Sequence, residues 1–161
     1  MNRYHSELIN KWYLSPRRKP LILRGARQVG KSTLVHIFAR ERQLELYEIN
    51  LERHLNLNKV FKTLETERIV AELEAITQNK ITDKGLLFLD EIQAVPEAIP
   101  ALRYFYEEKP TLPIIAAGSL LEFALKDHNY SMPVGRIQYM HIEPMTFEEF
   151  LDAIQADYFS E

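Results

Sequence analysis

Residues 25–32 form a glycine-bounded loop, Gly-Ala-Arg-Gln-Val-Gly-Lys-Ser, that matches the pattern GxxxxGK[ST] in full. The apolar residues 21–23 before the loop predict a strand, and residues 31–42 after it predict a helix. Glycines at the first and sixth positions let the backbone turn so that successive N–H groups face phosphate oxygens, and the dipole of the helix adds to this attraction. The order strand, loop, helix therefore predicts an α/β fold that binds the phosphates of a nucleotide.

The side chains of this loop have separate expected roles. Lys31 is long enough to reach the terminal phosphates, and the Ser32 hydroxyl can bind Mg²⁺. We expect Arg27 to contribute mainly its backbone N–H group, and a phosphate contact from its side chain stays open as an addition. The alternative is a tight turn that contains a lysine by chance. The full set of expected nucleotide-binding residues is Gly25, Ala26, Arg27, Gln28, Val29, Gly30, Lys31, Ser32 and Thr33.

A second signal is the apolar run at residues 86–89, which ends in two acids, Asp90 and Glu91. At the carboxyl end of a strand, Asp90 can help to hold Mg²⁺. Glu91 can orient the water that attacks the terminal phosphate and accept its proton. The alternatives are a turn or helix-capping residue for Asp90 and a solvated loop acid for Glu91. Together with the loop, the two acids predict hydrolysis of a nucleoside triphosphate.

The remaining hydrophobic pattern predicts helices that alternate with short apolar strands. Strands with no polar face are typical of a parallel sheet that helices cover on both sides. We expect helices over residues 8–13, 31–42, 60–78, 97–108, 119–126 and from 146 onward, and strands over 21–23, 44–51, 86–90, 112–117 and 137–142.

Composition narrows the chemistry and the location. The 161 residues include no cysteine, which excludes disulfides and thiol chemistry and favours a reducing compartment. No apolar run approaches the roughly 18 residues of a membrane span, and the first residues lack the apolar core of a signal peptide. We therefore expect a cytoplasmic protein with no membrane partner.

Charge is unevenly distributed along the chain. Residues 1–40 hold nine Lys or Arg against one Asp or Glu, whereas residues 121–161 hold two against eight. The basic first quarter should attract an anion, but the net charge of -3 does not indicate a nucleic-acid partner. The anion is then a small molecule, or one that a partner of this chain binds.

Two other classes of phosphate-binding protein fit less well. A guanine-nucleotide switch needs Asn-Lys-x-Asp, but in residues 79–83, Asn-Lys-Ile-Thr-Asp, the aspartate comes one place too late. Small-metabolite kinases commonly have several arginines in a lid, and after Arg103 this chain has only Arg136. A GTPase is disfavoured, and a small kinase stays open as an alternative.

Four segments together resemble one family, the prokaryotic AAA-type predicted ATPases whose ATP-binding domain precedes an uncharacterised C-terminal domain. They are LILRGARQVGKSTL, LLFLDEIQAVP, IIAAGSLLEFAL and MPVGRIQYMHIEPMTFEEFL. The resemblance implies a phosphate-loop NTPase three-layer sandwich: a five-stranded parallel sheet in the order 5-1-4-3-2 with helices on both faces. It also implies that residues 1–161 form a single ATP-binding domain that ends before a lid and the C-terminal domain.

The same resemblance assigns roles to two more residues. Ser119 falls at the family's polar sensor position after the fourth strand, and its alternative role is a helix N-cap. Arg136 lies just before the fifth strand, where AAA-type ATPases often supply an arginine to the nucleotide of a neighbouring subunit. Its alternative is a structural or surface ion pair.

The resulting expectation is a Mg²⁺-dependent ATPase that binds ATP or ADP. Lys31, Glu91, Ser119 and Arg136 would be its catalytic residues, and Ser32 and Asp90 would hold the metal. Specificity for adenine rests on the resemblance alone. We also expect self-association or contact with a C-terminal domain, and slow turnover by this chain alone. The alternative from another class is an interaction module that nucleotide binding gates with little turnover.

Overall fold

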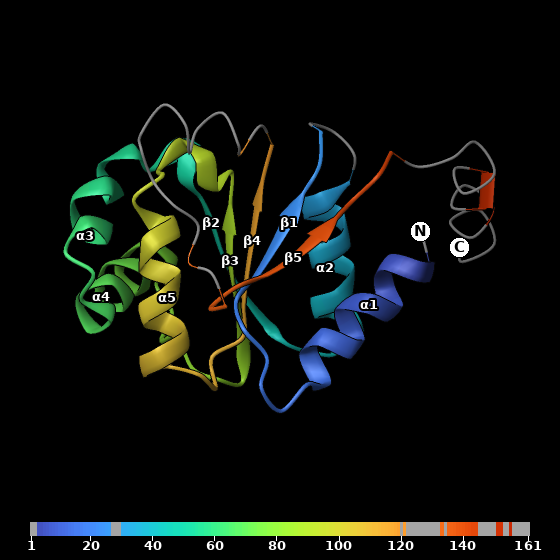
Figure 1. The fold of residues 1–161 in the computed structure, drawn as a ribbon, viewed down its shortest axis with the longest axis horizontal. Coiled ribbons are helices and arrows are strands. Elements are labelled where there is room, and N and C mark those ends of the chain that lie inside the picture. Colours follow the sequence, from blue (N-terminus) through green and yellow to red (C-terminus); the bar gives the residue numbers. More distant parts are fainter. Residues whose placement is uncertain are drawn as a thin grey trace.

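Five parallel strands form one sheet in the order β2-β3-β4-β1-β5 (Figure 1). The computed structural model describes residues 3–26, 30–119, 121, 133, 135–144, 151–152 and 155. The order 5-1-4-3-2 implied by the resemblance is confirmed, because it is the same order counted from the other edge. The strands are β1 (Leu21–Arg24), β2 (Glu45–Asn50), β3 (Gly85–Asp90), β4 (Ile114–Gly118) and β5 (Gln138–His141).

Helices cover both faces of this sheet, so the fold has three layers (Figure 1). On one face lie α1 (Arg3–Leu14) and α2 (Lys31–Glu41). On the other lie α3 (Asn58–Lys62), α4 (Thr66–Thr77) and α5 (Ala98–Glu108). Three short 3₁₀ helices connect these elements: η1 (Leu51–Arg53), η2 (Leu55–Leu57) and η3 (Ile92–Ala94).

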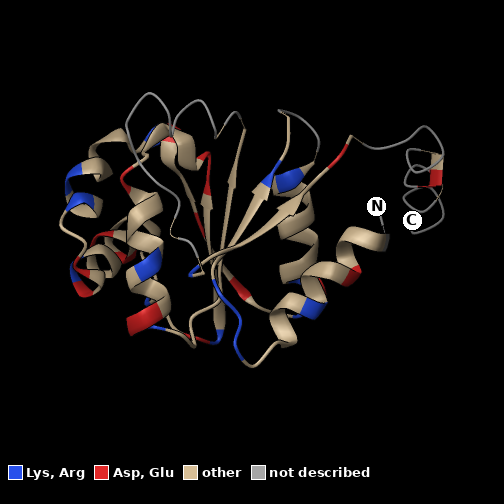
Figure 2. Cartoon of the chain, viewed as in Figure 1, with Lys and Arg blue, Asp and Glu red and all other residues tan. Residues whose placement is uncertain are grey.

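The apolar run of β3 is explained by two cores, one on each face. Leu86 and Phe88 belong to the core beneath α1 and α2, whereas Leu87 and Leu89 belong to the core beneath α3, α4 and α5. All four are fully buried. Successive side chains of a strand point to opposite faces of the sheet. In a strand that helices cover on both sides, every side chain is therefore buried and is expected to be apolar. Charged residues accordingly lie mostly on the helices and at the strand ends (Figure 2).

The single helix expected over residues 60–78 is wrong. The chain leaves α3 after Lys62 and begins α4 at Thr66, and Leu64 between them has a left-handed φ of 59°. The Thr63 hydroxyl explains the break, because it donates to the Val60 carbonyl at 2.6 Å and accepts from a backbone N–H two residues on. Such local hydrogen bonds compete with helix propagation.

The other predicted elements agree with the structure to within a few residues where they are described. The first helix is longer than expected, because α1 begins at Arg3. Most of the helix expected over 119–126 lies outside the described residues. Of the helix expected from residue 146, only residues 151–152 and 155 are described. None of the described helices is long and apolar enough to cross a membrane.

Candidate functional site

Three strand ends meet at one edge of the sheet, and the predicted site residues Lys31, Ser32, Asp90, Glu91 and Ser119 follow or end these strands. The loop begins directly after Arg24 of β1, β3 ends in Asp90, and β4 is followed by Ser119. Because β3, β4 and β1 are neighbours in a parallel sheet, their carboxyl ends lie side by side (Figure 1). This edge is where open α/β sheets generally bind ligands.

The described part of the loop has the backbone expected of a phosphate-binding turn. Gly30 has a φ of 89° and caps the N-terminus of α2, and a Cβ there would meet no atom within 4 Å. Glycine is therefore favoured at this position for its backbone conformation and not for space. Arg27, Gln28 and Val29 lie outside the described residues, so their predicted contacts stay predictions.

Lys31, the first residue of α2, points back into the loop. Its side chain is buried, and Nζ donates to the carbonyl oxygens of Gly25 at 2.9 Å and Ala26 at 2.7 Å. The positive charge thus lies inside the curve of the loop, beside the N-terminal end of the α2 dipole. Both favour a bound anion at this point.

Ser32 and Asp90 are in direct contact although 58 positions separate them. The Ser32 hydroxyl donates to Asp90 Oδ2 at 2.8 Å. A hydroxyl and a carboxylate are oxygen ligands of the kind that Mg²⁺ prefers, so the pair fits such an ion. Among the described residues, no group of three or more His, Cys, Asp or Glu side chains is arranged so that it could hold a metal ion by itself. A cation here would take further ligands from phosphate and water, as Mg²⁺ commonly does at nucleotide sites.

The surroundings of Asp90 disfavour its negative charge. Burial raises the pKa of the carboxyl, and the nearby carboxylates of Glu91 and Glu48 raise it further. The hydrogen bond from Ser32 acts in the opposite direction, as does one from the backbone N–H of Glu91 at 2.9 Å. A divalent cation beside Asp90 would offset both burial and repulsion, which supports the same assignment.

Glu91 occupies an unusual backbone conformation directly after β3. Its φ of 54° is left-handed, which costs free energy for a residue other than glycine, and it caps η3. Its carboxylate accepts a hydrogen bond from Gln93 Nε2 at 2.5 Å. Strained residues of this kind cluster at functional sites, so the observation agrees with the role predicted for Glu91.

Ser119 has a buried hydroxyl that lacks a hydrogen-bond partner within the described part of the chain. Its exposed fraction is 2%. Buried polar groups are nearly always paired, so an unpaired hydroxyl beside the loop is suited to contact a ligand. The predicted sensor role has this support. The alternative N-cap role involves a helix that lies mostly outside the described residues.

The structure does not bring Arg136 to the loop. Arg136 precedes β5, whose first residue, Gln138, is in register with the first residue of β1, Leu21. It therefore lies at the edge where the strands begin. Its Nε is 3.4 Å from Glu107 Oε1, and Arg103 Nε is 3.1 Å from the same oxygen. The contact with Arg103 lowers the pKa of the Glu107 carboxyl most strongly, and the contact with Arg136 lowers it further. Within one chain the ion-pair role is what this geometry supports.

Gln93 is the residue that sequence reasoning missed. It lies on η3 between the ends of β3 and β4, and its amide contacts Glu91. A glutamine two positions after the paired acids carries no recognisable sequence signal, because glutamine is common on protein surfaces. Only the turn at Glu91 makes the contact evident.

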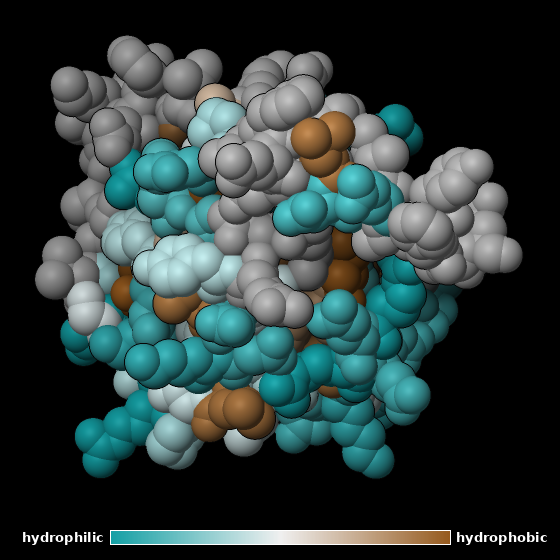
Figure 3. All heavy atoms as spheres, turned by 90° about the vertical axis from the view of Figure 1, so that its right-hand side faces the viewer, coloured by the Kyte–Doolittle hydropathy of each residue, from teal (hydrophilic) through white to brown (hydrophobic). Residues whose placement is uncertain are grey.

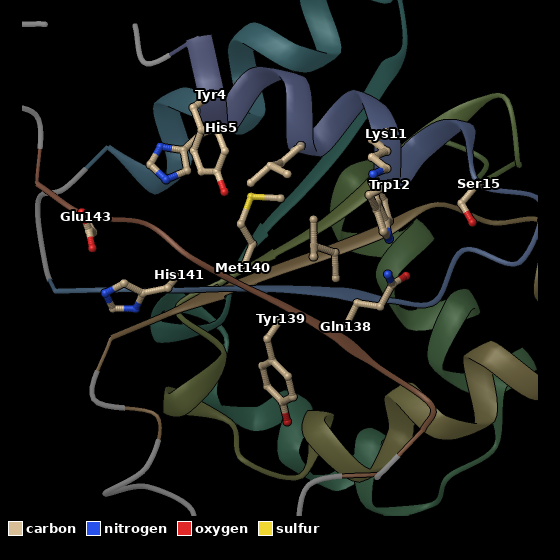
Figure 4. A pocket seen from close by; sticks show the side chains of 12 residues that line it. Tyr4, His5, Lys11, Trp12, Ser15, Gln138, Tyr139, Met140, His141 and Glu143 are labelled. Carbon is tan, nitrogen blue, oxygen red and sulfur yellow. The ribbon is translucent and has the colours of Figure 1, made fainter.

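A groove of about 660 Å³ lies between α1 and β5 (Figure 4). Apolar and polar side chains both line it, including Tyr4, Trp12, Met140 and His141. In the space-filling view an apolar strip is visible in the hollow between hydrophilic surroundings (Figure 3). His141 is in register with Arg24, the last residue before the loop, so one end of the groove is close to the phosphate site.

Comparison with known proteins agrees with this geometry. A family model described as "AAA domain" matches residues 17–151. A protein named "Replication factor C large subunit" from Sulfurisphaera tokodaii is 36% identical over 91 residues, which cover 55% of this chain and 19% of that protein. A protein of the same name from Sulfolobus acidocaldarius is 33% identical over 120 residues, covering 68% of this chain and 26% of that protein. The matched regions thus span only 19% and 26% of these relatives' lengths.

Proposed function

Because this chain belongs to the AAA domain family of phosphate-loop ATPases, we propose that it binds ATP with Mg²⁺ and hydrolyses the terminal phosphate bond. The observation that carries the proposal is the 2.8 Å contact between Ser32 and Asp90. It joins the second residue of α2 to the last residue of β3 and so provides two oxygen ligands next to each other. A parallel sheet covered by helices needs no such contact for its stability.

In this proposal the chain first binds the phosphates. The backbone N–H groups of the loop and the N-terminus of α2 would face them, and Lys31 would exchange the carbonyls of Gly25 and Ala26 for phosphate oxygens. Ser32 and Asp90 would hold Mg²⁺. When bound, that ion supplies charge neutralisation on the phosphate oxygens.

The chemical step is the attack of water on the terminal phosphorus. A new P–O bond forms to the water oxygen, the bond from phosphorus to the bridging oxygen breaks, and ADP and inorganic phosphate leave. The Glu91 carboxylate accepts the proton of the water. The Ser119 hydroxyl, buried next to the same edge, donates a hydrogen bond to the terminal phosphate or orients the water.

We place the base of the nucleotide in the groove between α1 and β5. Its end at His141 is close to the loop, and its aromatic and apolar side chains suit a flat heterocycle. Specificity for ATP over other nucleoside triphosphates rests on the family.

A nucleotide-gated interaction module with little turnover is the second candidate, and the position of Arg136 favours it. Arg136 lies at the far edge of the sheet, so it can stabilise the transition state only in a neighbouring subunit. The relatives are named as subunits, which supports assembly into a larger complex. The word "Replication" in the relatives' name raises the question of a nucleic-acid partner. The net charge of -3 of this chain gives no independent indication of one.

Replacing Lys31 by alanine tests the binding site. The change removes the ammonium that the loop holds, so we expect the dissociation constant for Mg-ATP to rise by at least about tenfold, or about 1.4 kcal/mol. Isothermal titration calorimetry measures it. Lys84→Ala is the matched control, because Lys84 is exposed just before β3, at the opposite edge of the sheet. Unchanged affinity in a folded Lys31→Ala variant would remove the phosphate-loop assignment.

A further inference from the structure

The carboxamide of Gln93 lies between two strand ends of the site. On one side its Nε2 donates to Glu91 Oε2 at 2.5 Å. On the other side its Oε1 lies against Gly118, the last residue of β4, where an added Cβ would be only 2.7 Å away. One side chain thus connects the acid after β3 with the strand that leads into Ser119.

Chemistry fixes the direction in which this amide points. An ionised carboxylate has no proton to donate, so the NH₂ group must face Glu91 and the amide oxygen must face Gly118. That oxygen is buried and, among the described residues, has no hydrogen-bond partner. Rotating the amide would place two acceptors against each other at Glu91.

Gly118 provides the space that the amide occupies. It carries no unusual φ, so its lack of a side chain matters for contact and not for backbone conformation. A methyl group there would meet Gln93 Oε1 at 2.7 Å and Ile92 Cγ2 at 3.1 Å. The Gln93 side chain can therefore occupy its observed position only because residue 118 is a glycine.

We propose that Gln93 is a positioning residue that holds the Glu91 carboxylate in the orientation needed to accept a proton from the attacking water. This rests on the proposed function, in which Glu91 is the base. The hydrogen bond occupies Oε2 and restricts rotation of the side chain, which leaves Oε1 of Glu91 to face the water.

The test is single-turnover hydrolysis of Mg-ATP by the chain and by its Gln93→Ala variant. We expect the rate to fall about tenfold, because a misplaced base loses part of its effect, while the dissociation constant for Mg-ATP stays within about twofold. Gln93→Glu keeps the size of the side chain, removes the donor and adds a like charge, so it should slow hydrolysis at least as much. A rate equal to the parent in both variants would overturn the proposal.

Two double variants separate positioning from a general structural effect. In a Glu91→Gln background the base is absent, so adding Gln93→Ala should cost nothing further. Gly118→Ala should slow the parent by displacing the amide, but it should cost little more once Gln93→Ala has removed that amide. Independent, multiplying losses in both backgrounds would contradict a role through Glu91.

Crystal structures of the parent and of Gln93→Ala provide a readout that does not depend on activity. The Glu91 carboxylate should be ordered on Gln93 in the parent and should change rotamer or lose order in the variant. An unchanged carboxylate would overturn the inference even if the chain hydrolyses ATP. If Glu91→Gln hydrolyses as fast as the parent, the base assignment fails instead, and the rotamer comparison then decides the contact separately.

Discussion

A chain in which glutamine replaces Glu91 should bind Mg-ATP about as tightly as the parent but hydrolyse it more slowly, by on the order of 10²-fold in a single turnover. The substitution preserves the size of the side chain and its ability to accept a hydrogen bond, and removes the group that takes the proton. Glu91 lies next to Asp90 but does not itself contact Ser32 in the described hydrogen bonds, so the metal ligands remain.

The measurement combines calorimetric titration with quenched-flow detection of phosphate under enzyme excess. Glu45→Gln is the matched control, because Glu45 is exposed at the start of β2, at the opposite edge of the sheet. It should leave both binding and rate unchanged. Equal single-turnover rates in Glu91→Gln and the parent would exclude Glu91 as the base.

Arg136→Ala should have the largest effect on turnover if subunits associate, a loss on the order of 10³-fold, the lower end of what an arginine supplied in trans contributes. Because Arg136 lies at the edge where the strands begin, it can act only in a neighbour. Hydrolysis per chain should then rise with protein concentration. Mixing Arg136→Ala with Lys31→Ala chains should restore part of the activity, since an intact pocket then meets an intact arginine.

Arg103→Ala is the control that the structure supplies, because Arg103 and Arg136 both pair with Glu107. If Arg136 serves only the ion pair, the two alanine variants should behave alike in stability and in phosphate release. If the rate of phosphate release per chain is already high at low protein concentration, and Arg136→Ala leaves it unchanged, the proposed action of Arg136 in a neighbouring subunit is contradicted. Arg136 would then keep its structural role alone.

Much of the sheet could be predicted because its three central strands, β1, β3 and β4, are almost entirely buried. The apolar run before Asp90 has no polar position, which indicates helices on both faces, and the loop after residues 21–23 identifies the first strand. The strand order came from the resemblance and not from these patterns. The break at Leu64 was missed because helical spacing of apolar residues continues across it, whereas the Thr63 hydrogen bonds that end α3 are local.

The candidate site could be predicted only where its functional residues lie within short, recognisable sequence motifs. The Ser32–Asp90 contact joins two sequence motifs that follow β1 and β3, strands that β4 separates, and the structure places these oxygens 2.8 Å apart. The contact of Gln93 could not be predicted in this way, because it depends on the left-handed turn at Glu91.

The most direct test of the central claim is a crystal structure of the chain with Mg²⁺ and a non-hydrolysable ATP analogue. We expect the terminal phosphates at the N-terminus of α2, with Lys31 Nζ about 3 Å from a phosphate oxygen in place of the carbonyls of Gly25 and Ala26. The metal ion should be bound by the Ser32 hydroxyl, with Asp90 directly or through water beside it. Phosphates bound away from residues 25–32, or a metal ion that approaches neither Ser32 nor Asp90, would contradict the account.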